Sequence, residues 1–443
     1  MPSLTSSAAM LRQAAVQAGS PELRLSDLYQ RIKHAVFELT LEQLDARGVA
    51  AEETSPVVVR EEIEQAMHRY ALREGLAMNA AERMSLAEDV HNEVTGLGPI
   101  EPLLRDPTVD DVIVNGALRV YSERAGKLTP EPVRFRDDAH VMNIIQRIIG
   151  PIGRRVDEAT PYVDARLKDG SRVNIVIPPV ALDGPLLSIR KFRAQPMTPA
   201  DFVHGGSLSE EMMEFLASSV KSRLNILICG GTGSGKTTLL NMLSGFIGEQ
   251  ERVVTIEDAA ELQIRKSHVA RMETRPPNLE GAREVSARDL TRNALRMRPD
   301  RIILGEVRGA EAVEMLQAMS TGHDGSMATM HANSSRDAFA RLEMLLGFGG
   351  MNGDAKTLRR YIANSIQVMV QVQRMANGCR RVVSISEVTG IEGDSYSLNT
   401  LFDFAESPPL SGTGEFRVHS SRPFYAARLV KAREAQPSLV GGL

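Results

Sequence analysis

The stretch of sequence that decides the fold is ILICGGTGSGKTT, residues 226–238. It matches the phosphate-binding template G-x-x-x-x-G-K-[ST], with Gly230 at its start and Gly235-Lys236-Thr237 at its end. The template needs a strand before the loop and a helix after it, because loop amides and the helix N-terminus together form the anion site. The apolar run 225–229 predicts that strand, and leucines at helical spacing predict a helix over 237–246. A glycine-rich turn that binds nothing is the alternative, and the presence of strand, loop, lysine and helix together argues against it.

Each part of this loop has an expected role. Glycines let the backbone wrap the phosphates, Lys236 should reach the β- and γ-phosphates, and the hydroxyl of Thr237 should hold Mg²⁺. ATP and Mg²⁺ are therefore the predicted cofactors. The residues predicted to contact the nucleotide are Gly230, Gly231, Thr232, Gly233, Ser234, Gly235, Lys236, Thr237 and Thr238.

Composition argues against several classes of function. The chain of 443 residues has a net charge of −4, so no global basic excess points to nucleic acid or to an anionic membrane surface. Tryptophan is absent and aromatic residues make up 4%, which leaves few platforms for stacking bases. Nucleic-acid binding is therefore not expected, even along the arginine-rich stretch that contains Arg271, Arg275, Arg292, Arg296, Arg298 and Arg301.

Cysteine usage and hydropathy bear on the compartment. Two cysteines, Cys229 and Cys379, give no disulfide framework, which suits a reducing environment. Residues 1–20 lack the continuous apolar core of a signal peptide, and nowhere do 18 apolar residues run together. We therefore expect a cytoplasmic protein without a transmembrane segment.

Changes in apolar spacing and in proline and glycine content along the chain predict its domains. The length suggests two or three domains at ~150 residues each. Apolar residues at spacings of three and four predict helices in the first hundred residues, and a proline- and glycine-rich stretch predicts a linker near residue 200. The predicted parts are a flexible tail (1–22), a helical bundle (23–96), a mixed α/β domain (97–193), a linker (194–206) and an ATPase domain with a C-terminal extension (207–443). The helical stripes are either core or a surface that docks a partner.

Alternating strands and helices after residue 207 predict a mainly parallel sheet between helices, hence an α/β fold. The segment 382–430 is expected to form short strands and loops, and its residues suggest no chemistry.

Two acidic stretches follow predicted strands of this sheet. In TIEDAAEL, 255–262, the candidates are Glu257, Asp258 and Glu261, and Glu257 at the strand end is the preferred residue to orient water. In RIILGEVR, 301–308, Gly305 stands where aspartate is usual, so Glu306 is the candidate for catalysis and for Mg²⁺. For the first stretch, a solvated acidic strand end is the alternative.

Histidines and arginines complete the candidate site. His323 and His331 flank a predicted strand, and either sense the γ-phosphate or bond to neighbouring backbone. Arg172 and Arg190 precede the linker, and we expect one of them to contact nucleotide when the domains close. Surface salt bridges are the alternative for each arginine.

Together these stretches resemble the type II/IV secretion ATPases: a Walker A loop (230–237), an aspartate box (255–262), an atypical Walker B strand (302–306) and a histidine box (321–331). Gly305 agrees with this resemblance, since the family carries Glu where others carry Asp. GPIEPLL (98–104), VDARL (163–167), DGSRVN (169–174) and SIRKF (188–192) narrow the resemblance to the CpaF/TadA-type ATPases of Flp/Tad pilus assembly. The resemblance covers about residues 85–390.

This resemblance implies a RecA-like ATPase domain preceded by a smaller PAS-like α/β domain, with ATP clamped between the two in a homo-hexameric ring. It also implies a position at the cytoplasmic face of the inner membrane, beneath polytopic platform proteins that insert or extract pilin subunits. Members of this type lack the tetracysteine zinc insert of their type II secretion relatives, and two distant cysteines agree. The helical region matches no family motif, and a regulatory partner there stays open.

Three classes of function compete at this point. The first is an ATP-hydrolysing assembly motor, the second is an interaction protein gated by nucleotide with little turnover, and the third is a RecA-like motor on DNA. Phosphate release with and without single-stranded DNA separates the three.

Overall fold

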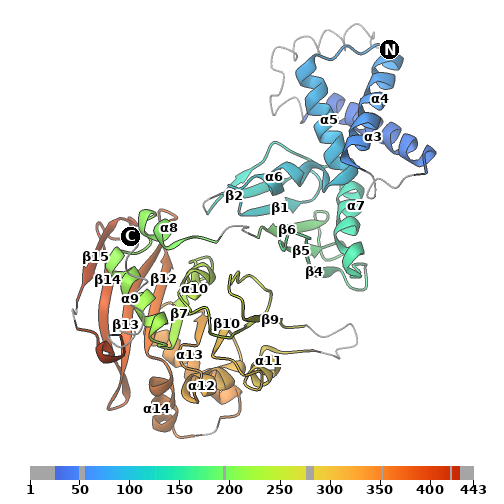
Figure 1. Ribbon diagram of the computed structural model, residues 1–443. Helices are drawn as coiled ribbons and strands as arrows, with labels where there is room; N and C mark the ends of the chain where they lie inside the picture. The colour runs from blue at the N-terminus through green and yellow to red at the C-terminus, as the bar shows by residue number, and fades with distance from the viewer. Residues whose placement is uncertain are drawn as a thin grey trace. The chain divides into compact units, whose positions relative to one another are not determined.

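Figure 1 shows the computed structural model of the chain. It describes residues 25–48, 55–124, 126–192, 196–275, 284–351, 353–419 and 422–429. The predicted tail, 1–22, lies outside these residues. The chain divides into two compact units, Met1–Arg193 and Ala194–Leu443.

Three helices open the first unit: α3 (Asp27–Ala46), α4 (Pro56–Glu74) and α5 (Ala80–Thr95). Each begins at a polar cap, since Ser26, Ser55 and Asn79 accept hydrogen bonds from backbone N–H groups of the first turn. The three helices share one apolar core, which includes Val36 and Val90. Residues of the predicted apolar stripes therefore lie inside this bundle.

A charged cluster joins the bundle to the rest of its unit. Glu93 of α5 accepts from Lys33 Nζ of α3 at 2.6 Å and is 2.8 Å from Nε2 of His140. His140 belongs to α7 (Asp138–Ile149), and Arg147 of the same helix donates to the carbonyl oxygens of Glu93 and Gly96. Burial raises the pKa of Glu93, but His140 and Lys33 outweigh it and lower the pKa to about 2.

The remainder of the first unit is a six-stranded sheet in the order β3-β2-β1-β6-β5-β4, and every described pair is antiparallel. Isoleucines of α7 pack against its strands, and α7 thereby supplies much of the core. The strands are β1 (Asp111–Asn115), β2 (Val120–Arg124), β3 (Lys127–Pro130), β4 (Tyr162–Arg166), β5 (Arg172–Val176) and β6 (Leu186–Arg190). Shorter helical elements are η2 (Gly98–Ile100), α6 (Glu101–Arg105) and η3 (Gly150–Ile152).

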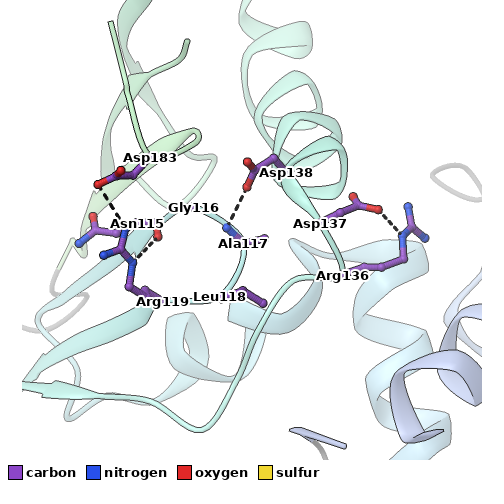
Figure 2. A pocket seen from close by; sticks show the side chains of 9 residues that line it. All are labelled: Asn115, Gly116, Ala117, Leu118, Arg119, Arg136, Asp137, Asp138 and Asp183. Atoms are coloured by element: carbon purple, nitrogen blue, oxygen red, sulfur yellow. Dashed lines mark hydrogen bonds and ion pairs between the residues drawn. The ribbon is translucent and has the colours of Figure 1, made fainter. Parts of the chain in front are cut away.

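A cavity of about 370 Å³ lies in this unit beside the turn from β1 to β2 (Figure 2). Asp138 accepts from the amide of Ala117, and Arg119 faces Asp183 at 3.6 Å. Arg136 donates to Asp137 at its other side. Most charges of the lining are therefore already matched, and none of the predicted site residues lies there.

The second unit is built on nine strands in the order β15-β14-β13-β12-β7-β11-β10-β8-β9. The six from β12 to β9 run parallel, and β13, β14 and β15 extend them antiparallel. The strands are β7 (Ile226–Gly230), β8 (Val253–Glu257), β9 (Val269–Glu273), β10 (Arg301–Val307), β11 (Met327–Met330), β12 (Val368–Arg374), β13 (Arg380–Glu392), β14 (Ser395–Glu406) and β15 (Gly414–Val418).

Both faces of the parallel sheet are covered. Along β7, Ile226 and Ile228 belong to one apolar core, and Leu227 and Cys229 belong to another on the opposite face. The fold class predicted from the sequence, a parallel α/β ATPase sheet preceded by a smaller mixed domain and helices, is confirmed. The helices are α8 (Pro199–His204), α9 (Glu210–Lys221), α10 (Lys236–Ser244), α11 (Ala287–Ala294), α12 (Glu311–Ser320), α13 (Ser335–Phe348) and α14 (Ala355–Ser365).

The structure differs from the sequence predictions at two places. The stretch expected as linker contains helix α8, which begins at a capping box between Thr198 and Asp201. The segment expected to form short strands instead contains two long ones, β13 of 13 residues and β14 of 12 residues. In the parts of the chain described here, no helix combines the length and apolar character that crossing a membrane requires.

Candidate nucleotide-binding site

The phosphate loop connects β7 to α10. A Cβ on Gly230 would overlap the carbonyl oxygen of Val372 on the neighbouring strand β12, so no larger residue fits at the start of the loop. Gly235 has φ +96°, a conformation that favours glycine, and it is followed at once by Lys236 at the start of α10. Close packing and backbone geometry thus explain the two glycines that frame the loop.

Inside the loop, the carbonyl oxygen of Gly231 accepts hydrogen bonds from two side chains. It accepts from Lys236 Nζ at 2.9 Å and from Ser234 Oγ at 2.8 Å. Lys236 is 7% exposed, and burial lowers its pKa while the charge of Glu306 works in the opposite direction. A phosphate oxygen can replace this carbonyl as the acceptor, which is the exchange that an anion site of this type requires.

The candidate acids follow strands of the same sheet. Because β7, β8, β10 and β11 are parallel, residues at their carboxyl ends share one edge with the loop. Glu257 ends β8, Glu306 lies near the end of β10, and His331 follows β11. The order of the strands, rather than nearness in sequence, therefore gathers these residues at the loop.

Glu306 is held by an arginine that the sequence analysis did not select. Arg308 donates to Glu306 at 2.5 Å and to Asp258 at 3.3 Å, and so bridges the acids of β10 and β8. His331 Nε2 lies 3.6 Å from the other oxygen of Glu306. Burial raises the pKa of Glu306, but Arg308, His331 and Lys236 outweigh it, and its pKa is lowered. Glu306 is thus held in its ionised form, which is the form that binds Mg²⁺.

Glu257 has different surroundings. It is 3% exposed, and its Oε2 accepts from the backbone N–H groups of Glu261 and Leu262 at 2.7 and 2.9 Å. Its Oε1 has no hydrogen-bond partner in the described ranges. Burial raises the pKa of Glu257. The residue therefore shapes the loop that follows β8, and it is also the acid of this group whose surroundings favour holding a proton.

The structure does not bring the two histidines together. His323 precedes β11 and His331 follows it, so they lie at opposite edges of the sheet, beyond the two ends of a strand that is about 13 Å long. At the His323 edge, the amides of Gly325 and Ser326 donate to Asn225, the residue before β7. His331 therefore lies at the edge that carries the phosphate loop, and His323 lies at the other edge.

Arg172 and Arg190 belong to the first unit. They are directly paired across β5 and β6, with Arg166 and Asp111 as their next neighbours in the row. Arg190 is ion-paired with Asp111 at 3.2 Å, and the side chain of Arg190 is 60% exposed. Like charges placed opposite each other destabilise a sheet, and the ion pair of Arg190 with Asp111 offsets part of that cost.

The predicted magnesium ligands are consistent with a site that is completed by substrate. Within the described residues, no group of three or more His, Cys, Asp or Glu could hold a metal ion by itself. Mg²⁺ usually takes one or two protein ligands, with phosphates and water supplying the rest. Thr237 and Glu306 match that limited demand, and this assignment stays a prediction.

A phosphate loop at the carboxyl edge of a parallel sheet covered on both faces defines a nucleotide-binding P-loop protein. More narrowly, the chain belongs to the type II/IV secretion system protein family, whose model matches residues 93–402. This is a family of secretion ATPases, and the loop supplies the nucleotide-binding element that such an activity needs.

The chain is similar to several named proteins. The chain is 40% identical over 310 residues to "Putative conjugal transfer protein Rv3659c" of Mycobacterium tuberculosis, which covers 69% of this chain and 88% of the relative. It is 28% identical over 353 residues to the type IV secretion system protein VirB11 of Bartonella quintana, covering 71% and 96%. The pilus retraction motor PilT with bound ADP is 19% identical, covers 76% of this chain and 87% of that one, and has a TM-score of 0.48.

Proposed function

We propose that this chain is an ATP-hydrolysing motor that acts as a homo-hexamer on the cytoplasmic face of the inner membrane and powers Flp/Tad-type pilus assembly. The observation that carries the enzymatic part is the meeting of Lys236, Glu306 and His331 at one edge of the sheet, with opposed effects of Lys236 and Glu306 on each other's pKa. A lysine for phosphate and a carboxylate for metal at such an edge are the parts that phosphoryl transfer to water requires.

The chemistry divides among the residues as follows. The loop amides and Lys236 hold the β- and γ-phosphates, and Thr237 and Glu306 hold Mg²⁺, which neutralises charge on the phosphate oxygens. Glu257 takes the hydrogen bond of the attacking water, with Asp258 and Glu261 as the neighbouring alternatives. His331 faces the same edge and reports on the γ-phosphate.

The assignment to pilus assembly rests on the sequence stretches GPIEPLL, VDARL, DGSRVN and SIRKF. In this proposal the partners are polytopic platform proteins of the inner membrane. Transport in a conjugation or type IV secretion system is the second candidate, favoured by the names of relatives that share 40% or less of their residues with this chain. A nucleotide-gated switch and a motor that tracks DNA are the remaining alternatives.

The first experiment measures phosphate release by the purified full chain with Mg²⁺ and ATP, with and without single-stranded DNA, together with its mass by light scattering. We expect turnover that DNA does not stimulate, and a hexamer when nucleotide is present. No turnover would favour the switch, and stimulation by DNA would favour the third class.

The second experiment assays the source organism after deletion of the gene, with complementation by the wild type and by Lys236→Ala. Loss of surface pili that only the wild type restores supports the pilus assignment. Intact pili with loss of plasmid transfer would instead support conjugation.

A further inference from the structure

An arginine from the far end of the chain contacts the phosphate loop. Arg380, the first residue of β13, donates from Nε to the carbonyl oxygen of Gly233 at 2.9 Å. Its Cδ lies 3.4 Å from the position that a Cβ on Gly235 would take, so the side chain also covers the end of the loop. The contact joins residues 147 positions apart in the sequence.

The sheet fixes this arginine in place. Val372 of β12 pairs with Gly230 of β7, at the residue where the loop begins. Arg374 at the end of β12 pairs with Arg380 at the start of β13, and the amide of Met375 closes the intervening turn on the carbonyl oxygen of Cys379 at 2.7 Å. The β12–β13 hairpin therefore lies next to the phosphate loop and holds Arg380 beside it.

The hydrogen bond controls the direction of one loop amide. In a trans peptide the C=O and N–H groups point to opposite sides, so a Gly233 carbonyl drawn toward Arg380 turns the N–H of Ser234 away from Arg380. That N–H lies 3.4 Å from the carbonyl oxygen of Gly231, the acceptor that Lys236 also uses. Arg380 thus keeps the N–H of Ser234 pointing toward the carbonyl oxygen of Gly231, where Lys236 Nζ and Ser234 Oγ also donate.

The charge of Arg380, like its hydrogen bond, favours an anion at the phosphate loop. Within the described part of the chain the side chain of Arg380 is bonded to this carbonyl oxygen and makes no ion pair with an acid, so its positive charge is not neutralised there. A cation beside a loop that binds phosphates lowers the free energy of the bound anion.

We propose that Arg380 is a positioning residue that holds the phosphate loop in the conformation that receives ATP. Through this contact, the antiparallel extension of the sheet takes part in nucleotide binding. The inference rests on the proposed function, because it assigns the anion of this loop to a nucleotide.

The test compares Arg380→Met and Arg380→Lys with the wild type in the full chain. Arg380→Met keeps the aliphatic stem and removes the charge and the donors, and Arg380→Lys keeps the charge. Arg417→Met is the matched control, since Arg417 lies on β15 of the same extension and makes an exposed pair with Glu415. The readouts are the Kd of fluorescently labelled ADP, the KM and kcat for ATP, and the melting temperature by circular dichroism.

For Arg380→Met we expect the Kd for ADP and the KM for ATP to rise about tenfold, because the free loop is no longer held in the conformation that receives the phosphates. The kcat should stay within about twofold, because a preorganised loop binds ground state and transition state alike. The Kd and KM of Arg380→Lys should lie between those of the wild type and those of Arg380→Met. The Kd and KM of Arg417→Met should match those of the wild type.

An unchanged Kd and KM in Arg380→Met would overturn the inference, and so would a fall in kcat at constant KM. If Arg380→Met does not fold, Arg380→Lys decides on the same two criteria. Wild-type protein that binds ADP and does not hydrolyse ATP would contradict the proposed function, whereas the comparison of Kd values would still test Arg380.

Discussion

Gly305 is packed against the side chain of Glu257: a Cβ on Gly305 would lie 2.9 Å from Cγ of Glu257. The position where aspartate is usual in such strands therefore has no room for a side chain, because Glu257 of the neighbouring strand β8 occupies the space. The pairing of β8 with β10 thus links the two acidic stretches. It also explains why the carboxylate of β10 appears one residue later, as Glu306.

Gly305→Ala should displace Glu257 and weaken the loop that its carboxylate supports. We expect a loss of about 1–3 kcal/mol in the free energy of unfolding, the usual cost of overpacking. We also expect turnover to fall about tenfold or more if Glu257 orients water, since about 1.4 kcal/mol in the barrier gives that factor. Denaturant unfolding and phosphate release measure the two effects.

Gly347→Ala is the control for that substitution. Gly347 lies in α13, and nothing is within 4 Å of its Cβ position. Replacing an unhindered helical glycine by alanine should stabilise the protein by about 0.5–1 kcal/mol and leave turnover unchanged. Equal effects of the two substitutions would contradict the packing argument.

Lys236→Ala should abolish hydrolysis and weaken nucleotide binding. The substitution removes the one side-chain cation of the loop, and it leaves the carbonyl oxygen of Gly231 with Ser234 as its remaining side-chain donor. Fluorescent ADP titration and phosphate release provide the measurements, with exposed Lys356 replaced by alanine as the control. Wild-type turnover in Lys236→Ala would refute the assignment of the site.

Glu306→Gln should separate binding from chemistry. The loop amides and Lys236 remain, so ATP should still bind, whereas Mg²⁺ and water are no longer correctly held and turnover should stop. Glu257→Gln is the informative partner, since glutamine keeps the shape of the side chain and cannot accept a proton. Normal hydrolysis in Glu257→Gln together with none in Glu306→Gln would place the base elsewhere.

Glu93 should make the first unit sensitive to acid. Its pKa of about 2 lies below the ordinary 4.5, so its contribution to stability is complete above pH 4.5 and is lost as the pH falls toward 2. A shift of that size corresponds to about 3 kcal/mol at most. Hydrogen exchange of α5 amides should therefore show faster opening in Glu93→Gln than in the wild type at pH 7, with the difference shrinking at pH 4. A difference that is independent of pH would contradict this role.

Much of the site could be predicted from sequence because its parts are local. Lys236, Thr237 and the glycines lie in one short motif, and strand β7 and helix α10 begin close to the predicted residues. The placement of His323 and of Arg380 depends instead on strand direction and strand order, which no local pattern encodes. Arg308 stood beside a predicted residue, and its pairing with Asp258 becomes visible only once β8 and β10 are known to be neighbours.

In the fold, too, the features set by local sequence could be predicted and those set by pairing between distant segments could not. Alternation of strands and helices predicted a parallel sheet, because each βα unit carries its own period of apolar residues. Helix α8 escaped prediction since its proline is a turn signal in sequence and also suits the first position of a helix. The length of β13 and β14 depends on their pairing with each other. Two register shifts occur along this pairing, and the strands continue beyond both.

The last prediction concerns the arginine row of the first unit. In phosphoryl transfer the loop and its lysine neutralise the ground state, and a further cation supplied as the site closes can raise turnover by ~10³ to 10⁵. Arg172 and Arg190 are paired neighbours on β5 and β6 with Arg166 beside them, and Arg190 also pairs with Asp111. Replacing either by glutamine should cut turnover far more than ATP affinity and leave the proposed hexamer intact. Phosphate release, ADP titration and light scattering measure the three quantities, with exposed Arg417→Gln as the control. Unchanged turnover in both variants would contradict the prediction that either arginine reaches the nucleotide.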